Sequence, residues 1–363
     1  MKTNLFKNAF NACVGLALFA AVFTACTKSS DNPVAMANKT TLTAVIDSCQ
    51  MLSTSATTTD YPQAAITSFQ TTLASAKTAA GNTTITQTAV DNLVVQLRAA
   101  ENMFLATAYG AIPASSVLFA LTFDEGTGTQ LTTTGSKAWT AMLMAGPSQL
   151  FGTNTGVPTF VAGKKGKAMH FAAGSHLEIN DYTASDLLST KMSIAVWVKT
   201  DSVRANNYII SYNDWYTWKF QTEDHGKPFY TVITAKGGTD ADNETVNSVP
   251  NATWTHLVIS LDLVAGKLDM YVNGVNTKEW TTVTKPNLTG TIMQYTPVSS
   301  AKLPLMIGEA FPYAEAKAVW PAAWGWETIP NWGYFTGSMD ELKVYNIALT
   351  DGQVAKLYKD ENK

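Results

Sequence analysis

The chain has 363 residues, of which only 15% are charged, and its formal net charge is −3 with a sequence pI near 5.8. Lysine and arginine form no cluster. The sequence therefore argues against nucleic acid or anionic lipid as a partner and favours a neutral ligand.

Residues 1–25 have the organisation of a bacterial signal peptide. Lys2 and Lys7 precede an apolar run that is too short to remain as a membrane-spanning helix. The run ends in Phe23-Thr24-Ala25-Cys26, which resembles a bacterial lipobox. This resemblance implies that Cys26 is lipidated with more than one acyl chain, which gives stable membrane attachment. The alternative is ordinary secretion with cleavage after an Ala-x-Ala site.

Residues 26–36 are predicted to be the lipidated cysteine and a flexible tether, because the segment is polar and contains Asp31, Asn32 and Pro33. Acidic residues just after the cysteine resemble the surface-export signal of Bacteroidetes lipoproteins, and Asp31 is the acidic residue here. We therefore expect an outer-membrane lipoprotein that faces the cell exterior. Display in the periplasm is the alternative.

Cysteine usage agrees with this placement. Cys13 leaves with the signal peptide and Cys26 is the anchor, so Cys49 alone remains in the mature fold. One thiol cannot form a disulfide or a cysteine-ligated zinc site. Cys49 lies in an apolar helical stripe, which predicts a small buried hydrophobic residue.

Residues 37–110 contain no tryptophan and little glycine, and their apolar residues recur at helical spacing. They predict an antiparallel three-helix bundle that acts as a spacer. The segment resembles the FIVAR-type modules of bacterial surface proteins at Tyr61-Pro62, Ala76-Lys77 and Val90–Leu97. A hinge follows at 111–116. The three stripes are Leu42, Val45, Ile46, Cys49 and Leu52; Ile66, Phe69, Leu73 and Ala76; and Val90, Leu93, Val94, Leu97, Met103 and Phe104.

Residues 117–360 contain all ten tryptophans, and their strand patterns alternate with turn signals such as Asn273-Gly274. Seven segments match, in order, the strands of the laminin-G-like domains of the concanavalin A-like lectin/glucanase superfamily. They are LFALTFDEGTGT, GKAMHFAAGSHLEI, SIAVWVKT, WTHLVISLD, GKLDMYVNGV, LPLMIGE and the closing FTGSMDELKVYNIALTDGQVAKLY. The resemblance implies an all-β jelly roll of two antiparallel sheets. Such folds host both lectins and glycosidases, so the fold does not decide the function.

A sugar-binding site needs flat apolar surfaces beside amides and carboxylates. Trp197 and Trp254 occupy positions where the family has core residues, and we expect both to be core. Strand alternation places Tyr216, Trp218 and Phe220 on one buried face, and Trp215, Thr217, Lys219 and Gln221 on the other. Trp215 shares its face with polar residues and follows Asn213 and Asp214, so these three are candidate sugar ligands.

A second aromatic cluster lies between Glu309 and Phe335, where the family usually makes a short connection. This chain instead inserts about 25 residues, and long loops in compact domains tend to be functional. Three prolines stiffen the insertion, which lowers the entropy lost on binding. We expect at least two of its four tryptophans to pack the loop onto the sheet, and one or more to join Trp215 in a ligand site. The four are Trp320, Trp324, Trp326 and Trp332.

The resemblance also implies one structural calcium ion. Its ligands would be Asp340, the turn around Asp124 and the carbonyl oxygen of Gly174. The alternative is that Asp124 is a turn acid and Asp340 an edge-strand acid. The sequence has no His-x-x-x-His motif or cysteine pair for zinc.

The glycosidases of the superfamily carry Glu-x-Asp-x-(x)-Glu on a strand, and this chain does not. Asp340-Glu341 is an acidic pair on a strand, but neighbours there point to opposite faces. We therefore expect a non-catalytic module that binds a polysaccharide or oligosaccharide, with other outer-membrane glycan-uptake proteins as partners. The alternatives are a glycoside hydrolase or lyase on the same fold, and a protein-binding adhesin module.

Overall fold

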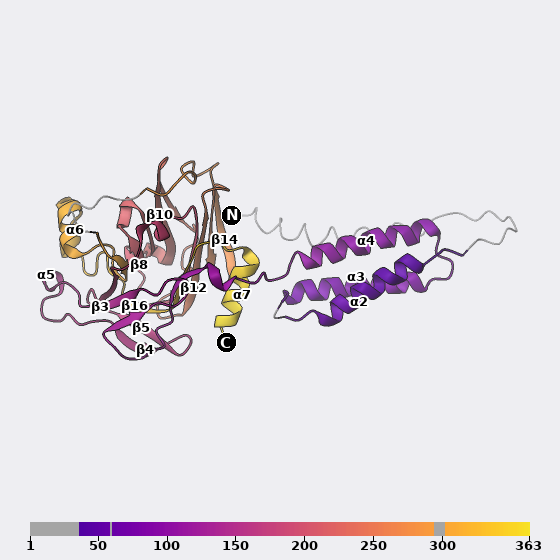
Figure 1. The fold of residues 1–363 in the computed structure, drawn as a ribbon, viewed down its shortest axis with the longest axis horizontal. Coiled ribbons are helices and arrows are strands. Elements are labelled where there is room, and N and C mark those ends of the chain that lie inside the picture. The colour runs from indigo at the N-terminus through magenta and orange to yellow at the C-terminus, as the bar shows by residue number, and fades with distance from the viewer. Residues whose placement is uncertain (1–35, 59, 294–301) are drawn as a thin grey trace. The chain divides into compact units, whose positions relative to one another are not determined.

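The computed structural model describes residues 36–58, 60–293 and 302–363 (Figure 1). The predicted signal peptide, Cys26 and nearly all of the predicted tether lie outside the described residues. No helix in the described ranges has the length and apolar character needed to cross a membrane. The described chain separates into two compact units, one of residues 36–51 and 71–99, the other of residues 52–70 and 100–363.

Three helices precede the β structure and pack through their apolar stripes. They are α2 (Thr40–Ser55), α3 (Gln63–Gly81) and α4 (Gln87–Leu105). Twelve of the fifteen stripe residues are buried, including Cys49, as the helical spacing predicts. The prediction that Met103 belongs to the third buried stripe was wrong, since its side chain is solvent-exposed. Leu52 and Val94 are half-buried.

The rest of the second unit is a sandwich of two antiparallel sheets, as the strand pattern predicts. Within the described residues each sheet has eight strands. The first sheet runs β14 (Val275–Thr281), β13 (Lys267–Val272), β12 (Thr255–Asp262), β7 (Lys191–Thr200), β16 (Gly337–Tyr345), β5 (Lys167–Phe171) and β4 (Thr159–Ala162), with β1 (Val117–Leu121) also paired to β16. The second runs β11 (Gly237–Asp242), β10 (Lys227–Thr234), β9 (Trp218–Glu223), β8 (Asn207–Tyr212), β15 (Leu305–Ile307), β6 (His176–Ile179), β3 (Thr140–Met144) and β2 (Gln130–Thr132).

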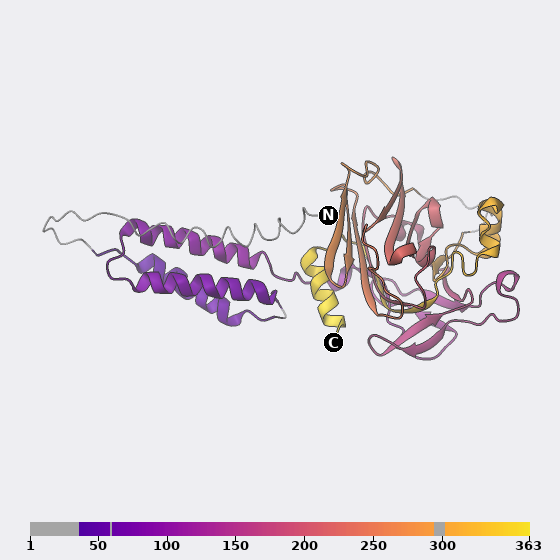
Figure 2. The same ribbon diagram turned by 180° about the vertical axis from the view of Figure 1, so that it is seen from behind.

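The main core lies between the sheets, where alternate residues of each strand interdigitate. Val196 and Val198 of β7 face Trp218 and Phe220 of β9 across a single cluster of buried side chains. The short helices α5 (Ser148–Phe151) and α6 (Tyr313–Val319) lie on the opposite side of the sandwich from α7 (Asp351–Glu361) (Figures 1 and 2).

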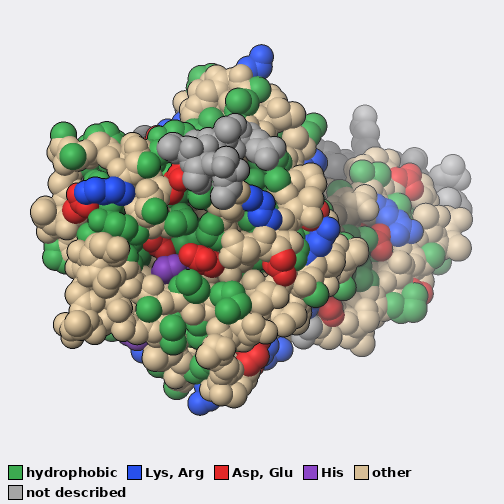
Figure 3. All heavy atoms as spheres, turned by 60° about the vertical axis from the view of Figure 1, so that its left-hand side comes forward, with side chains coloured by type: hydrophobic (Ala, Val, Ile, Leu, Met, Phe, Trp, Pro, Cys, Tyr) green, Lys and Arg blue, Asp and Glu red, His purple; other side chains and the backbone are tan. Residues whose placement is uncertain are grey.

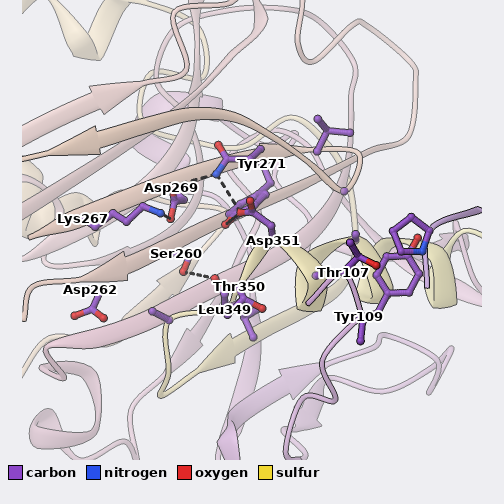
Figure 4. Close-up of a pocket in the computed structure, with 18 of the residues that line it drawn as sticks. Thr107, Tyr109, Ser260, Asp262, Lys267, Asp269, Tyr271, Leu349, Thr350 and Asp351 are labelled. Atoms are coloured by element: carbon purple, nitrogen blue, oxygen red, sulfur yellow. Dashed lines mark hydrogen bonds and ion pairs between the residues drawn. The ribbon is translucent and has the colours of Figure 1, made fainter. Parts of the chain in front are cut away.

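Helix α7 covers the outer face of the first sheet. Thr350 caps it through a capping box with Gln353, and Val354 packs among outward-facing residues of β7, β12 and β13. The Tyr271 hydroxyl donates to Asp351 Oδ1 at 2.8 Å, and Ser260 Oγ donates to the Leu349 carbonyl at 2.9 Å (Figure 4). These bonds join the helix start directly to β12 and β13.

Trp197 is buried as predicted, but it lies under α7 and not between the sheets. Its indole Nε1 donates to Glu361 Oε2 at 2.9 Å, and its ring stacks on Tyr358 at 5.5 Å. The prediction for Trp254 was wrong. This residue precedes β12, which begins at Thr255, so its ring lies outside the strand alternation and is half-buried.

Replacing these two tryptophans should therefore have unequal effects on stability. Trp197→Ala leaves a cavity and removes a partner of Glu361, and we expect it to lower the free energy of unfolding by about 3 to 5 kcal/mol. Trp254→Ala should cost less, about 1 kcal/mol, because its ring is only half-buried. Urea unfolding of the purified variants measures both values, and equal losses would contradict the different placements of the two rings.

Candidate functional site

The candidate site lies on the outer face of the second sheet. Alternation in β9 sends Trp218 and Phe220 into the core, and Lys219 and Gln221 to this outer face. Tyr208 of β8 also faces outward, yet all three outward side chains are fully or almost fully buried. The aromatic segment between Glu309 and Phe335 packs on Tyr208, and the ring of Trp215 lies over Lys219.

A turn between β8 and β9 carries Trp215. Asn213 and Asp214 adopt left-handed backbone conformations, with φ of 61° and 49°, and a short 3-10 turn spans Asp214–Tyr216. The chain therefore does not run as a strand here. For this reason the predicted burial of Tyr216 was wrong, and its side chain is solvent-exposed.

Asp214 is completely buried and joins the turn to the insertion. Its Oδ1 accepts a hydrogen bond from the Tyr208 hydroxyl at 2.8 Å, and its Oδ2 accepts one from Trp320 Nε1 at 2.9 Å. Lys219 Nζ is 3.9 Å from Oδ1. Burial raises the pKa of Asp214, while Lys219 and the two hydrogen bonds favour its ionised form.

Lys219 lies beneath the ring of Trp215. Its Nζ is 3.6 Å from the ring centroid, and it donates to Gln221 Oε1 at 2.7 Å and to the Tyr208 hydroxyl at 2.9 Å. Burial lowers the pKa of Lys219 to about 8, against the opposing effect of Asp214 and two further carboxylates. The cation supports one face of the indole, while 36% of Trp215 stays exposed.

The insertion is an ordered structure and not an irregular loop. It contains α6 and two 3-10 turns, Ala322–Trp324 and Trp326–Thr328. Its two ends pair with each other, since Ala310 N donates to the Gly333 carbonyl at 2.8 Å. Gly333 has a φ of 79°, and a Cβ atom there would lie 2.8 Å from the Trp320 ring.

Two charged contacts fasten the ends of the insertion to the sheets. The Arg204 guanidinium donates to the Asn331 carbonyl at 2.8 Å and to Thr336 Oγ1 at 2.9 Å. His176 Nε2 of β6 is 3.0 Å from Glu309 Oε2, and both side chains are buried. Burial alone would lower the pKa of His176, but Glu309 and Glu178 raise it to about 10.

Two of the four inserted tryptophans pack the loop onto the sheet, as predicted. Trp320 and Trp326 are 8% and 2% exposed and meet edge to face at 5.1 Å. Trp324 is 48% exposed and Trp332 is half-buried. The insertion therefore has an inner pair of indoles that anchors it and an outer pair that solvent can reach.

The aromatic pocket is the cavity of about 570 Å³ lined by Asn206, Tyr208, Trp215, Trp320, Trp324 and Trp332. Figure 3 turns the side of the molecule that carries α6 toward the viewer, and hydrophobic side chains form several patches on that surface. Four indoles, a phenol and a side-chain amide suit apolar stacking combined with hydrogen bonding.

The structure thus brings four of the five nominated tryptophans into one pocket, although Trp215 is about 100 residues from the others in sequence. Trp326 lies behind Trp320 and does not line the pocket. Asp214 is beneath it, and Asn213 is buried beside Asp214. Sequence reasoning missed Asn206 and Tyr208, although the alternation of β8 would have placed Tyr208 on the outer face.

Of the three residues nominated for calcium, Asp124 and Asp340 lie together, and Gly174 lies at the other end of β5. Asp124 Oδ1 accepts from Lys167 N at 2.9 Å, and Asp340 Oδ2 accepts from Lys165 N at 2.9 Å, so both carboxylates bind the turn before β5. Gly174 follows the other end of β5, and its carbonyl oxygen is 2.9 Å from His176 Nδ1. The described ranges contain no group of three acidic, histidine or cysteine side chains that could hold a metal.

Comparison with protein families supports the sandwich fold. Residues 171–300 match the Laminin_G_3 model, described as the concanavalin A-like lectin/glucanases superfamily. This match covers the middle of the sandwich, from the end of β5 to beyond β14. No curated protein matches the chain.

Several solved structures resemble the chain at low identity. Domain 4 of AbnA, a GH43 arabinanase from Geobacillus stearothermophilus solved with arabinotriose, is 20% identical, with a TM-score of 0.45 over 67% of this chain and 98% of that domain. The binding domain of Paraclostridial Mosquitocidal Protein 1 is 13% identical, with a TM-score of 0.42 over 66% of this chain and 53% of that one. The botulinum neurotoxin DC binding domain, solved with SialylT, is 11% identical, with a TM-score of 0.45 over 68% and 52%.

The pair of His176 and Glu309 predicts a pH-dependent stability. Because the folded-state pKa of His176 lies above its unfolded value of 6.5, this stabilisation is complete below pH 6.5 and is lost as pH rises toward 10. The loss should approach roughly 1.4 kcal/mol per pH unit within that window. Urea unfolding of the parent and of Glu309→Gln at pH 6, 8 and 10 should show a stability difference that shrinks as pH rises. A difference that stays constant across the range would contradict the ion pair.

Proposed function

We propose that this protein is a non-catalytic glycan-binding module and that the aromatic pocket is its site. The observation that carries the proposal is the convergence of Trp215 with Trp320, Trp324 and Trp332 around one cavity. Exposed indoles offer flat apolar faces that stack on the C–H faces of sugar rings, and aromatic side chains are common in binding hot spots.

The polar groups of the pocket favour a neutral sugar. Asn206 contributes a side-chain amide to the lining, and Tyr208 contributes a hydroxyl that already donates to Asp214 and accepts from Lys219. The charges of Asp214 and Lys219 lie beneath the aromatic surface and compensate each other. A neutral hydroxylated ligand therefore fits this lining better than an ionic one.

We also propose the cellular arrangement that the N-terminal residues imply. Lipidation at Cys26 would hold the protein at the outer membrane, facing the cell exterior, with the three helices as a spacer. The protein would bind polysaccharide at that surface and pass it to neighbouring glycan-uptake proteins. The arabinanase domain solved with arabinotriose makes arabinan a reasonable member of the first glycan panel.

The exposed and buried indoles should respond differently to truncation. Trp215→Ala and Trp324→Ala should each weaken glycan binding by roughly 1 to 3 kcal/mol. Trp324→Ala should change the melting temperature little, because its ring is half exposed, and Trp215→Ala should lower it modestly, because its ring also covers Lys219. Trp326→Ala is the matched control from the same insertion. It should destabilise the fold by about 3 to 5 kcal/mol, because its ring is buried.

Affinity electrophoresis in gels containing neutral polysaccharides, together with thermal melting, measures both effects. Retention without shortening of the glycan supports a binding module, and shortening would instead indicate a hydrolase or lyase. Retention that survives both Trp215→Ala and Trp324→Ala would disprove the aromatic pocket as the site. Lack of retention on every glycan would favour a protein-binding adhesin.

The anchor is tested separately. Because the lipid would attach through the thiol of Cys26, Cys26→Ala should move the protein from the membrane fraction to the soluble fraction while its melting temperature stays unchanged. Fractionation followed by immunoblotting measures the distribution, and Cys49→Ala serves as the control cysteine. Membrane association that persists in Cys26→Ala would remove the lipoprotein proposal.

A further inference from the structure

Trp332 lines a second cavity as well as the aromatic pocket. This second cavity has a volume of about 480 Å³. One wall is the insertion, with Ile329, Pro330 and Asn331, and the other is the segment around α5, with Phe151 and Asn154. The two cavities therefore have one indole in common and lie next to each other on the surface.

The wall from α5 is held in place by close packing. The Phe151 ring meets Tyr334 edge to face at 5.3 Å. Gly174 has a φ of 74°, and a Cβ atom there would lie 2.3 Å from the Phe151 ring. Glycine at this position thus allows the close approach of Phe151. The opposite wall is fixed by Arg204, which donates to the Asn331 carbonyl at 2.8 Å.

The two cavities differ in chemistry. The aromatic pocket is lined mainly by indoles, whereas the lining of the second cavity includes Asn154 and Asn331 beside Ile329 and Pro330. Glu327 also lines the second cavity, and its charge is compensated by Lys317, whose Nζ lies 2.6 Å from Glu327 Oε1. Amides both donate and accept hydrogen bonds, as sugar hydroxyls require. Volumes of about 570 and 480 Å³ each fall in the range of ligand pockets, roughly 300 to 1,000 Å³.

We infer that the two cavities are adjacent subsites for one extended neutral oligosaccharide, which crosses Trp332 and places its next residues against Asn154 and Asn331. The inference rests on the proposed function and adds to it a preference for chain length. A ligand that fills both cavities gains contacts that a ligand confined to the aromatic pocket lacks, without a second loss of translational freedom.

Isothermal titration with oligosaccharides of two to six residues, from the arabinan, xylan, mannan and cellulose series, tests the inference. For whichever polysaccharide series the parent protein binds, its affinity should rise about tenfold or more from the disaccharide to the hexasaccharide. Asn154→Ala should reduce this gain several-fold, and Asn154→Arg, which also obstructs the cavity, should abolish it. Neither should alter affinity for the disaccharide. Asn251→Ala, in an exposed turn that lines neither cavity, is the control.

The outcomes separate the two proposals. If the parent shows no gain with length, or if the gain survives both Asn154 variants, the second subsite is wrong while the aromatic pocket stands. If Trp215→Ala binds every oligosaccharide as tightly as the parent, or if no series binds, the aromatic pocket fails and the second subsite fails with it.

Discussion

One buried carboxylate holds together the two parts of the chain that form the aromatic pocket. Asp214 accepts hydrogen bonds from Tyr208 in the sheet and from Trp320 in the insertion, and Lys219 supplies the opposite charge. Removing one partner of such a buried pair typically costs about 3 to 5 kcal/mol, because it leaves an uncompensated charge in the interior. The insertion is therefore fixed in a defined position over the sheet. Without that position Trp324 and Trp332 would not face Trp215.

The surrounding contacts make the pocket rigid before any ligand arrives. Arg204 holds one end of the insertion through backbone carbonyls, and the ion pair of His176 and Glu309 holds the other. Gly333 lets the chain pass directly against the Trp320 ring. A site whose side chains are already ordered loses less conformational entropy on binding, so more of the stacking energy is available as affinity. Long loops are usually the mobile parts of a domain, and here the buried indoles give the loop a small core of its own.

The sequence predicted the fold and most of the pocket lining, and its errors have identifiable physical causes. The sandwich could be predicted because the alternation of apolar and polar residues marks each strand, and the order of the strands matches the family. Trp254 was misplaced because it lies just before β12, and Tyr216 because it ends a 3-10 turn before β9; an alternating pattern does not show where a strand begins. The left-handed backbone at Asn213 and Asp214 is also invisible to a period-two pattern. The burial of Tyr208 and Asp214 depends on a segment about 100 residues further along the chain, so no local window could show that these polar groups form the floor of the pocket.

The sandwich has two outer faces, and the chain covers them in different ways. On the first sheet, α7 packs against the outer face through an apolar cluster that includes Val258, Tyr271 and Val354. The cavity beside the start of α7 is lined mainly by polar and small residues and by no tryptophan (Figure 4). On the second sheet the insertion buries Trp320 and Trp326 but leaves Trp324 and Trp215 about half and a third exposed. Removing an exposed indole lowers the free energy of unfolding little, so the fold itself does not require these rings at the surface. Their position around a cavity whose floor contains buried charges is the observation on which the proposed glycan site rests.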